Sequence, residues 1–156
     1  MNDISSFQID HLNLKPGIYL SREDQVGDRT LKSYDLRITA PNHEVVMNTG
    51  EMHTIEHLVA TFLRNDEQFK DEVIYFGPMG CRTGFYMILT DRVAHEEVLD
   101  LMKRAFTFAA AFEGEIPGAT AKGCGNYLDH NLPMANYYSA RYFETLNQVE
   151  DLSFDY

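Results

Sequence analysis

The stretch NTGEMHTIEHLVATFLRN, from Asn48 to Asn65, predicts the central helix of the fold. Asn48 can cap its start, and Glu51 follows three residues later, as in a capping box. Apolar residues recur at helical spacing along it: Ile55, Leu58, Val59, Phe62 and Leu63. One side of this helix can therefore lie in a hydrophobic core, while its remaining side chains stay available for polar contacts.

The polar side of the same helix carries His53, Glu56 and His57. Residues four apart lie about 5–6 Å from each other on one helix face, so both imidazoles can reach a single metal ion. Glu56 shares that edge and has the position of a general base. Two other interpretations stay open. One is a partly exposed helix without metal, and the other is a reverse-oriented zinc peptidase, which takes a downstream carboxylate as third ligand.

A catalytic metal usually has three protein ligands and one open position. Cys124, in KGCGNY, is a candidate third ligand because its flanking glycines allow close approach. Cys81, in GPMGCRTG, is either a packed turn residue, a chemically active thiol, or the fourth ligand of a closed structural metal site. Of the other histidines, we expect His95 to be exposed to solvent and His130 to have a structural role.

Elements on either side of this helix predict an α+β fold. Alternation places Tyr34, Leu36 and Ile38 on one face of a strand, with Ser33, Asp35 and Arg37 on the other. Two short strands are expected at 72–76 and 85–90, and two helices at 92–112 and 133–149. Strands and helices do not alternate regularly, so we expect a mainly antiparallel sheet with helices packed on one side.

Composition sets the limits of the function. The 156 residues suit a single domain, and 44% are hydrophobic, as in globular proteins. A net charge of −11 repels phosphate backbones, so nucleic-acid binding is not expected. No apolar run approaches the roughly 20 residues of a membrane span, and the first residues lack the regions of a signal peptide. We therefore expect one catalytic domain over residues 1–156, in the cytoplasm, with reduced cysteines.

Six short motifs, taken in order, resemble the S-ribosylhomocysteine lyases of the LuxS family. They are Ser6-Phe7, Asp10-His11, Asp35-Leu36-Arg37 with Pro41-Asn42, His53 to Leu58, Pro78 to Gly84, and Cys124-Gly125. The resemblance implies cleavage of the thioether of S-ribosylhomocysteine to homocysteine and dihydroxypentanedione, the precursor of a quorum-sensing autoinducer. It also implies a homodimer with active sites at the subunit interface. One departure is Tyr75-Phe76-Gly77, where many members have Asp-Ile-Ser.

The resemblance also assigns roles to individual residues. The metal ligands would be His53, His57 and Cys124, the proton carriers Glu56 and Cys81, and the substrate-site residues Ser6, His11 and Arg37. It implies Fe(II) as the working ion, one per subunit, and two imidazoles with a thiolate also suit Zn or Co(II).

Arg37 has two interpretations. Its guanidinium can clamp the amino-acid carboxylate of the homocysteine moiety in a bidentate pair. Alternatively, it is a surface strand residue that pairs with Asp35 or Glu44.

Overall fold

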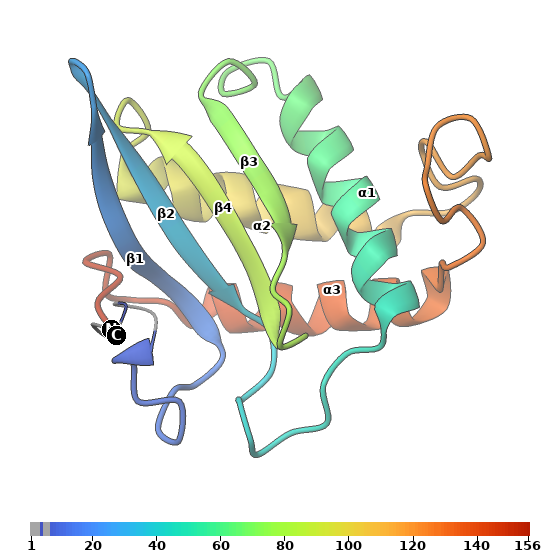
Figure 1. Cartoon of the computed structure of the whole chain (residues 1–156), viewed down its shortest axis with the longest axis horizontal. Helices are drawn as coiled ribbons and strands as arrows, with labels where there is room; N and C mark the ends of the chain where they lie inside the picture. The colour runs from blue at the N-terminus through green and yellow to red at the C-terminus, as the bar shows by residue number, and fades with distance from the viewer. Residues whose placement is uncertain (1–3, 5–6) are drawn as a thin grey trace.

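The computed structural model describes residue 4 and residues 7–156, so Ser6, a predicted substrate-site residue, lies outside the described residues. A four-stranded antiparallel sheet has the order β1-β2-β4-β3. Its strands are β1 (Gly17–Val26), β2 (Arg29–Arg37), β3 (Val73–Pro78) and β4 (Gly84–Thr90). The helices are α1 (Thr49–Asn65), α2 (His95–Ala111) and α3 (Leu132–Asn147). The expected α+β class is confirmed (Figure 1).

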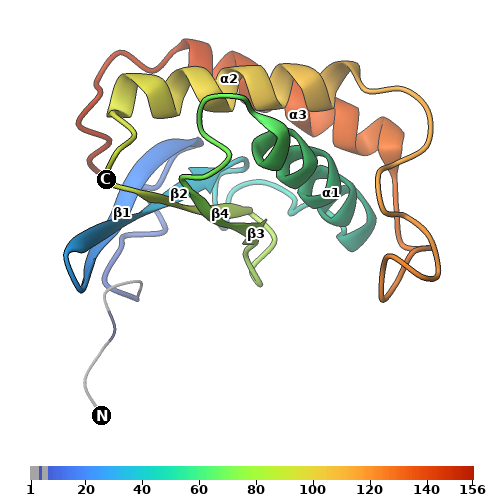
Figure 2. The same ribbon diagram turned by 90° about the horizontal axis from the view of Figure 1, so that it is seen from above.

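Helices α2 and α3 pack together over one face of the sheet (Figure 2). Helix α1 lies beside β3 and contacts both α2 and α3. Side chains alternate between the two faces of a strand, and those of β2 that face the helices are fully buried. Tyr34 and Leu36, together with Ile38 just after the strand, have no exposed surface. The other face of β2 is polar as predicted, but it is not open to solvent at Asp35 and Arg37, which are also buried.

Helix α1 forms as its sequence predicts. The Glu51 carboxylate accepts a hydrogen bond from the Asn48 N–H at 2.6 Å, completing the expected capping box. Ile55, Leu58 and Leu63 have no exposed surface, so the apolar side of the helix is the one that joins the core. The polar side is left facing the loop before α3, which projects beyond the helix in both Figure 1 and Figure 2.

The chain after α3 explains one wrong prediction. His95, expected to be exposed, is half-buried at the start of α2 because residues 152–154 fold back over it. Its Nδ1 atom lies 2.6 Å from the Leu152 carbonyl oxygen, and its ring stacks on that of Phe154 at 4.8 Å. Within the described part of the chain, no helix combines the length and hydropathy that crossing a bilayer requires.

Candidate metal centre

Three donor atoms converge where α1 meets the loop before α3. The Nε2 atoms of His53 and His57 are 3.1 Å apart, and the Cys124 Sγ atom is 3.3 Å from that of His53. Tetrahedral coordination of a zinc-sized ion would separate two nitrogens by about 3.3 Å and a nitrogen from a sulfur by about 3.6 Å. The predicted ligands thus lie close to the spacing that one ion requires.

The hydrogen bonds of the two rings decide which nitrogens are free. The Nδ1 atom of His53 is 2.9 Å from the Asp129 carbonyl oxygen, and that of His57 is 2.7 Å from the Pro117 carbonyl oxygen. A carbonyl oxygen only accepts, so each Nδ1 atom carries the hydrogen. The neutral rings then direct two Nε2 lone pairs at each other, an arrangement that a cation between them stabilises. The donor set therefore fits a divalent transition metal.

His130 is a fourth donor in this cluster, which sequence reasoning assigned only a structural role. The Thr54 hydroxyl donates to the Gly50 carbonyl oxygen at 2.8 Å and accepts from the Asn131 N–H at 3.0 Å. With that hydrogen used, the His130 Nδ1 atom, 3.1 Å away, must be the donor to Thr54. Its Nε2 atom is buried and has no hydrogen-bond partner among the described residues. Burial, with His53 and His57 nearby, lowers the pKa of His130.

The ring planes show that His130 is not equivalent to the other donors. A coordinated metal lies near the plane of each imidazole that binds it. The planes of His53 and His57 are 84° apart and can share such a point, whereas His130 stacks on His53 at 4.1 Å with only 18° between their planes. Nearly parallel stacked planes meet far from both rings. His53, His57 and Cys124 are therefore the three donors that can share one ion, and His130 stacks on His53 beside them.

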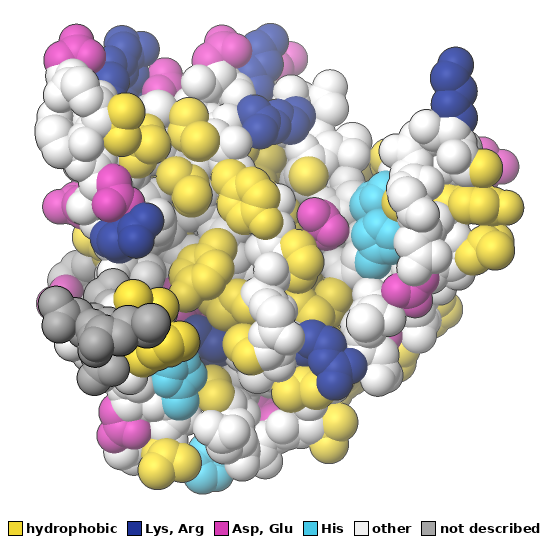
Figure 3. All heavy atoms as spheres, viewed as in Figure 1, with side chains coloured by type: hydrophobic (Ala, Val, Ile, Leu, Met, Phe, Trp, Pro, Cys, Tyr) yellow, Lys and Arg dark blue, Asp and Glu magenta, His cyan; other side chains and the backbone are white. Residues whose placement is uncertain are grey.

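A cleft of about 520 Å³ opens in front of the donors. It is lined by His53, Glu56, His57, Ala60, Thr61, Pro117, Gly118, Gly123, Cys124 and Gly125. Figure 3 shows histidine side chains gathered here, between α1 and the projecting loop. Glu56 is therefore in the same cleft as the metal donors, as the helical spacing predicts, and the glycines leave the approach to Cys124 open.

Cys81 and Arg37 form a second group, in and beside the turn between β3 and β4. The Arg37 Nη1 atom donates to the Thr83 Oγ1 atom at 2.6 Å and lies 3.8 Å from the Cys81 Sγ atom. Gly84 allows this close packing, because a Cβ atom there would lie 2.2 Å from the Leu36 carbonyl oxygen. A positive charge next to an exposed thiol is the environment in which reactive cysteines are found.

Asp35 occupies one edge of the Arg37 guanidinium, which was expected to clamp the substrate carboxylate. The Arg37 Nε atom donates to Asp35 Oδ1 at 3.0 Å, and its Nη2 atom donates to Asp35 Oδ2. This is the Asp35 pair considered as an alternative, but it is buried rather than on the surface. Burial raises the pKa of Asp35, although Arg37 acts in the opposite direction. The Nδ1 atom of His11 is 2.8 Å from the Ile9 carbonyl oxygen.

The predicted residues thus fall into two groups within one chain. His53, Glu56, His57 and Cys124 share the metal cleft, but Cys81, Arg37 and His11 do not line it. A larger cleft of about 730 Å³, over β1 and the segment before it, contains none of the predicted residues that the structure describes.

Comparisons with known proteins place this geometry in a family. The family described as S-Ribosylhomocysteinase (LuxS) matches residues 4–152. The chain is 58% identical over 150 residues to a protein of Finegoldia magna named S-ribosylhomocysteine lyase, covering 96% of this chain and 95% of the relative. It is 49% identical to the protein of that name from Clostridium acetobutylicum, covering 100% of this chain and 99% of the relative.

The chain belongs to the LuxS family. Membership agrees with the three donors found at metal spacing, and the resemblance seen in the six motifs is confirmed over nearly the full length. A reverse-oriented peptidase takes a carboxylate as third ligand, and the candidate cluster of the described residues contains none, which removes the main support for that interpretation. Cys81 is not part of that cluster, so within one chain the structure does not support it as the fourth ligand of a closed site.

Proposed function

We propose that this chain is a metal-dependent S-ribosylhomocysteine lyase that releases homocysteine and dihydroxypentanedione. One observation supports this most strongly. In a LuxS chain, the unprotonated Nε2 atoms of His53 and His57 lie together beside Cys124, in the cleft that also contains Glu56. The C–S bond of the thioether breaks, with homocysteine thiolate as the leaving group, only when a carbanion forms on the neighbouring carbon. The carbonyl of the opened ribose must therefore migrate along the chain before elimination of the thiolate.

Each shift of the carbonyl requires one proton to be removed and one to be returned. When bound by His53, His57 and Cys124, a divalent metal supplies a Lewis acid that makes the hydrogens next to the carbonyl acidic. Glu56 is in the cleft with these ligands and takes the role of the base that moves those protons. The hydrogen bonds from His53 and His57 to backbone carbonyl oxygens fix both rings, so the two Nε2 donors keep a constant position.

Cys81 is the second proton carrier in this proposal. Its sulfur lies 3.2 Å from the Thr83 hydroxyl and beside Arg37, so a charged and a polar group both face it. Ser6, His11 and Arg37 are proposed to bind the substrate. Since Asp35 holds the Nε–Nη2 edge of Arg37, a substrate carboxylate would meet the Nη1 end, next to Cys81.

A homodimer accounts for the separation of the two groups. We propose that the active site forms between subunits, with the metal cleft of one chain facing the Cys81 group of the other. The face of the sheet opposite α2 and α3 supports this, because apolar side chains gather on it (Figure 3). Ile74 and Tyr75 of β3 are each 46% exposed, which is surface that a partner could cover.

The remaining aspects of the proposal follow from the donor set and the cysteines. Fe(II) is proposed as the ion in cells, with Zn or Co(II) as substitutes, because two imidazoles and one thiolate suit all three. Both cysteines are free, in agreement with a reducing cytoplasm. Residues 1–156 would act as one catalytic domain that recycles homocysteine and supplies the precursor of the quorum-sensing signal.

Product analysis tests the proposal. Protein purified anaerobically and loaded with Fe(II) or Co(II) is incubated with S-ribosylhomocysteine, and separately with a mixed peptide library. We expect stoichiometric release of homocysteine thiol with no net oxidation or reduction, and no peptide cleavage. Peptide cleavage without thiol release would contradict the proposal and favour the peptidase interpretation.

A further inference from the structure

Asp35 and Arg37 form an ion pair with almost no exposed surface. Asp35 is 0% and Arg37 2% exposed, and both carboxylate oxygens accept from the guanidinium. Removing two charges from water is costly, so such a pair is stable only when its remaining hydrogen-bonding positions are also filled. The Asp35 carboxylate can accept more hydrogen bonds than the two from Arg37, so it requires a further donor.

Tyrosines from three parts of the chain surround this carboxylate. Tyr19 of β1 and Tyr86 of β4 are the cross-strand neighbours of Asp35 on either side of β2. Tyr156 lies above, and its hydroxyl donates to Asp35 Oδ2 at 3.0 Å. Its ring stacks on that of Tyr19, with centroids 4.9 Å apart and planes 5° apart. Tyr156 therefore adds a hydrogen bond to the one carboxylate that holds Arg37.

The segment before Tyr156 is fixed to the sheet. The Leu20 N–H donates to the Phe154 carbonyl oxygen at 2.7 Å. The Phe154 side chain is buried, and the backbone φ angle of this residue is 57°. Tyr156 itself is 47% exposed, so it contributes little to the core. The hydroxyl can therefore be removed without opening a cavity in the protein.

Electrostatics gives this hydrogen bond a defined effect. Burial raises the pKa of Asp35, while Arg37 and the Tyr156 hydroxyl act in the opposite direction. An ionised carboxylate accepts from both the Nε and Nη2 atoms of Arg37, and this leaves the Nη1 atom pointing at Thr83 and Cys81. Loss of the hydroxyl would weaken the carboxylate's hold on one edge of the guanidinium.

We propose that Tyr156 and Asp35 are positioning residues that hold the Arg37 guanidinium beside Cys81. Neither touches the reacting atoms. Tyr156 orients Asp35, Asp35 fixes the Nε–Nη2 edge of Arg37, and the Nη1 end is thereby kept next to the sulfur. The part of this inference that concerns catalysis rests on the proposed function of Cys81 as a proton carrier.

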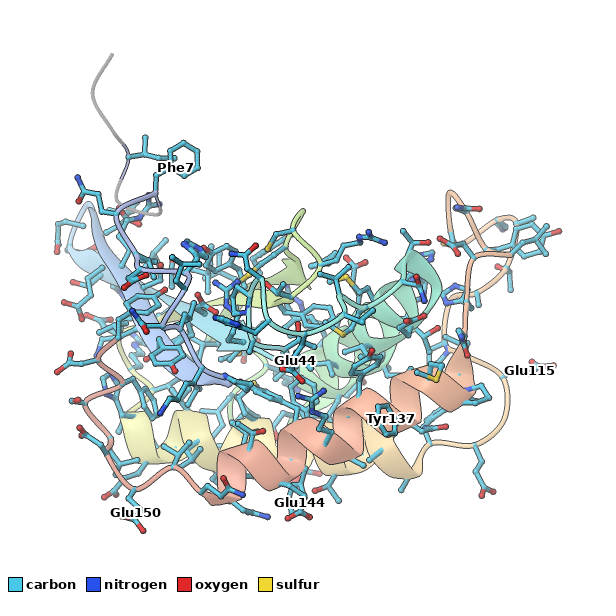
Figure 4. The ribbon with its side chains drawn as sticks, turned by 90° about the horizontal axis from the view of Figure 1, so that it is seen from below. Phe7, Glu44, Glu115, Tyr137, Glu144 and Glu150 are labelled. Carbon is cyan, nitrogen blue, oxygen red and sulfur yellow. The ribbon has the colours of Figure 1, made fainter. Side chains whose placement is uncertain are left out.

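The test compares Tyr156→Phe with the parent and with Tyr137→Phe. Tyr137 is an exposed tyrosine on α3, away from the sheet (Figure 4), so it is a matched control. The first measurement is the solvent-exchange rate of the Arg37 Nε hydrogen by ¹⁵N NMR, assigned with Arg37→Lys. One hydrogen bond of ordinary strength corresponds to about fivefold, so we expect this rate to rise about fivefold or more in Tyr156→Phe and to stay unchanged in Tyr137→Phe.

The second measurement is homocysteine release by the same metal-loaded proteins. We expect kcat to fall about fivefold in Tyr156→Phe with bound metal unchanged, because Cys81 acts after binding. We also expect KM to rise, because Arg37 is proposed to bind the substrate carboxylate as well. A parent exchange rate in Tyr156→Phe would overturn the inference, since the ring alone would then suffice. Faster exchange with parent kcat would also overturn it. If the parent released no homocysteine, the proposed function would fail while the exchange rates still decided whether Tyr156 positions Arg37.

Discussion

The Nε2 atoms of His53 and His57 lie 3.1 Å apart, and the Nδ1 atom of each ring is bonded to a backbone carbonyl oxygen. Two carbonyls from the loop before α3 thus fix the tautomers of two side chains on α1. Helical spacing brings the rings together, but the loop decides which nitrogens are free for a metal.

His130→Ala should retain one metal ion per chain. His130 stacks on His53 with 18° between ring planes and cannot share an ion with it in this arrangement, so its loss removes support rather than a ligand. Removal of such a supporting partner typically weakens metal affinity about 10–100-fold. Competition with a coloured chelator measures the affinity. A variant that bound no metal even at saturating concentration would show that His130 is a ligand.

Glu56→Gln and Cys81→Ala should keep both the fold and the metal but lose turnover. Neither side chain supplies a ligand in this account, and general acid–base groups contribute about 10²–10⁴-fold. Homocysteine release and elemental analysis are to be measured on the same samples. Glu144→Gln serves as a control, since Glu144 is exposed on α3 and points away from the sheet (Figure 4). Turnover at the parent rate in Cys81→Ala would return Cys81 to a packing role.

Mixing two inactive variants tests whether the site is shared between chains. His57→Ala lacks the metal centre and Cys81→Ala lacks the second proton carrier. If each site combines the metal of one chain with Cys81 of the other, a mixed dimer contains one intact site. An equal mixture that has exchanged subunits should then recover about a quarter of parent activity, since half of the dimers are mixed. No recovery, with exchange confirmed by mass spectrometry, would show that both groups act within one chain.

Asp66, which follows α1, should stabilise the fold in a pH-dependent way. Burial tends to raise its pKa, but the Arg104 guanidinium and the N–H groups of Phe69 and Gln68 lower it below 3.8 overall. A lowered pKa contributes stability above the unfolded value, and this is lost as pH falls through the folded value. Asp66→Asn should therefore cost about 1–2 kcal/mol at pH 7, discounted because Arg104 is 39% exposed, and progressively less below pH 4.

Urea denaturation followed by circular dichroism at pH 7 and pH 3 measures this cost. Asp71→Asn is the control, because Asp71 is an exposed aspartate in the same connection between α1 and β3. If the loss of unfolding free energy in Asp66→Asn were the same at both pH values, the charge of Asp66 would not be what stabilises the turn after α1.

Sequence reasoning predicted most of the elements and the two histidine donors because these depend on local spacing, whereas Cys124 was proposed from its flanking glycines and from the family resemblance. Helix α1 follows from its apolar period and capping box, and His53 and His57 are one helical turn apart. It missed the place of His130, because five residues of irregular loop separate it from Cys124 and no period governs their path. That path is set by tertiary contacts, including the His130–Thr54 hydrogen bond across 76 positions.

The burial of Asp35 and Arg37 was beyond sequence reasoning for a similar reason. Alternation correctly gave them the polar face of β2, but it cannot show that Tyr19, Tyr86 and Tyr156 cover that face. The approach of Arg37 to Cys81, 44 positions later, likewise depends on the pairing of β2 with β4. Spacing predicts which side chains share a face, and only the assembled sheet shows what lies on it.

Metal titration is the most direct test of the central claim. Protein stripped of metal under anaerobic conditions is titrated with Co(II) while homocysteine release from S-ribosylhomocysteine is followed, in parallel with Cys124→Ala. The account predicts activity that rises in proportion to bound metal and stops at one ion per chain, with weak or no binding and no release in Cys124→Ala. Full metal occupancy in Cys124→Ala, or parent-level release from the stripped protein, would contradict it.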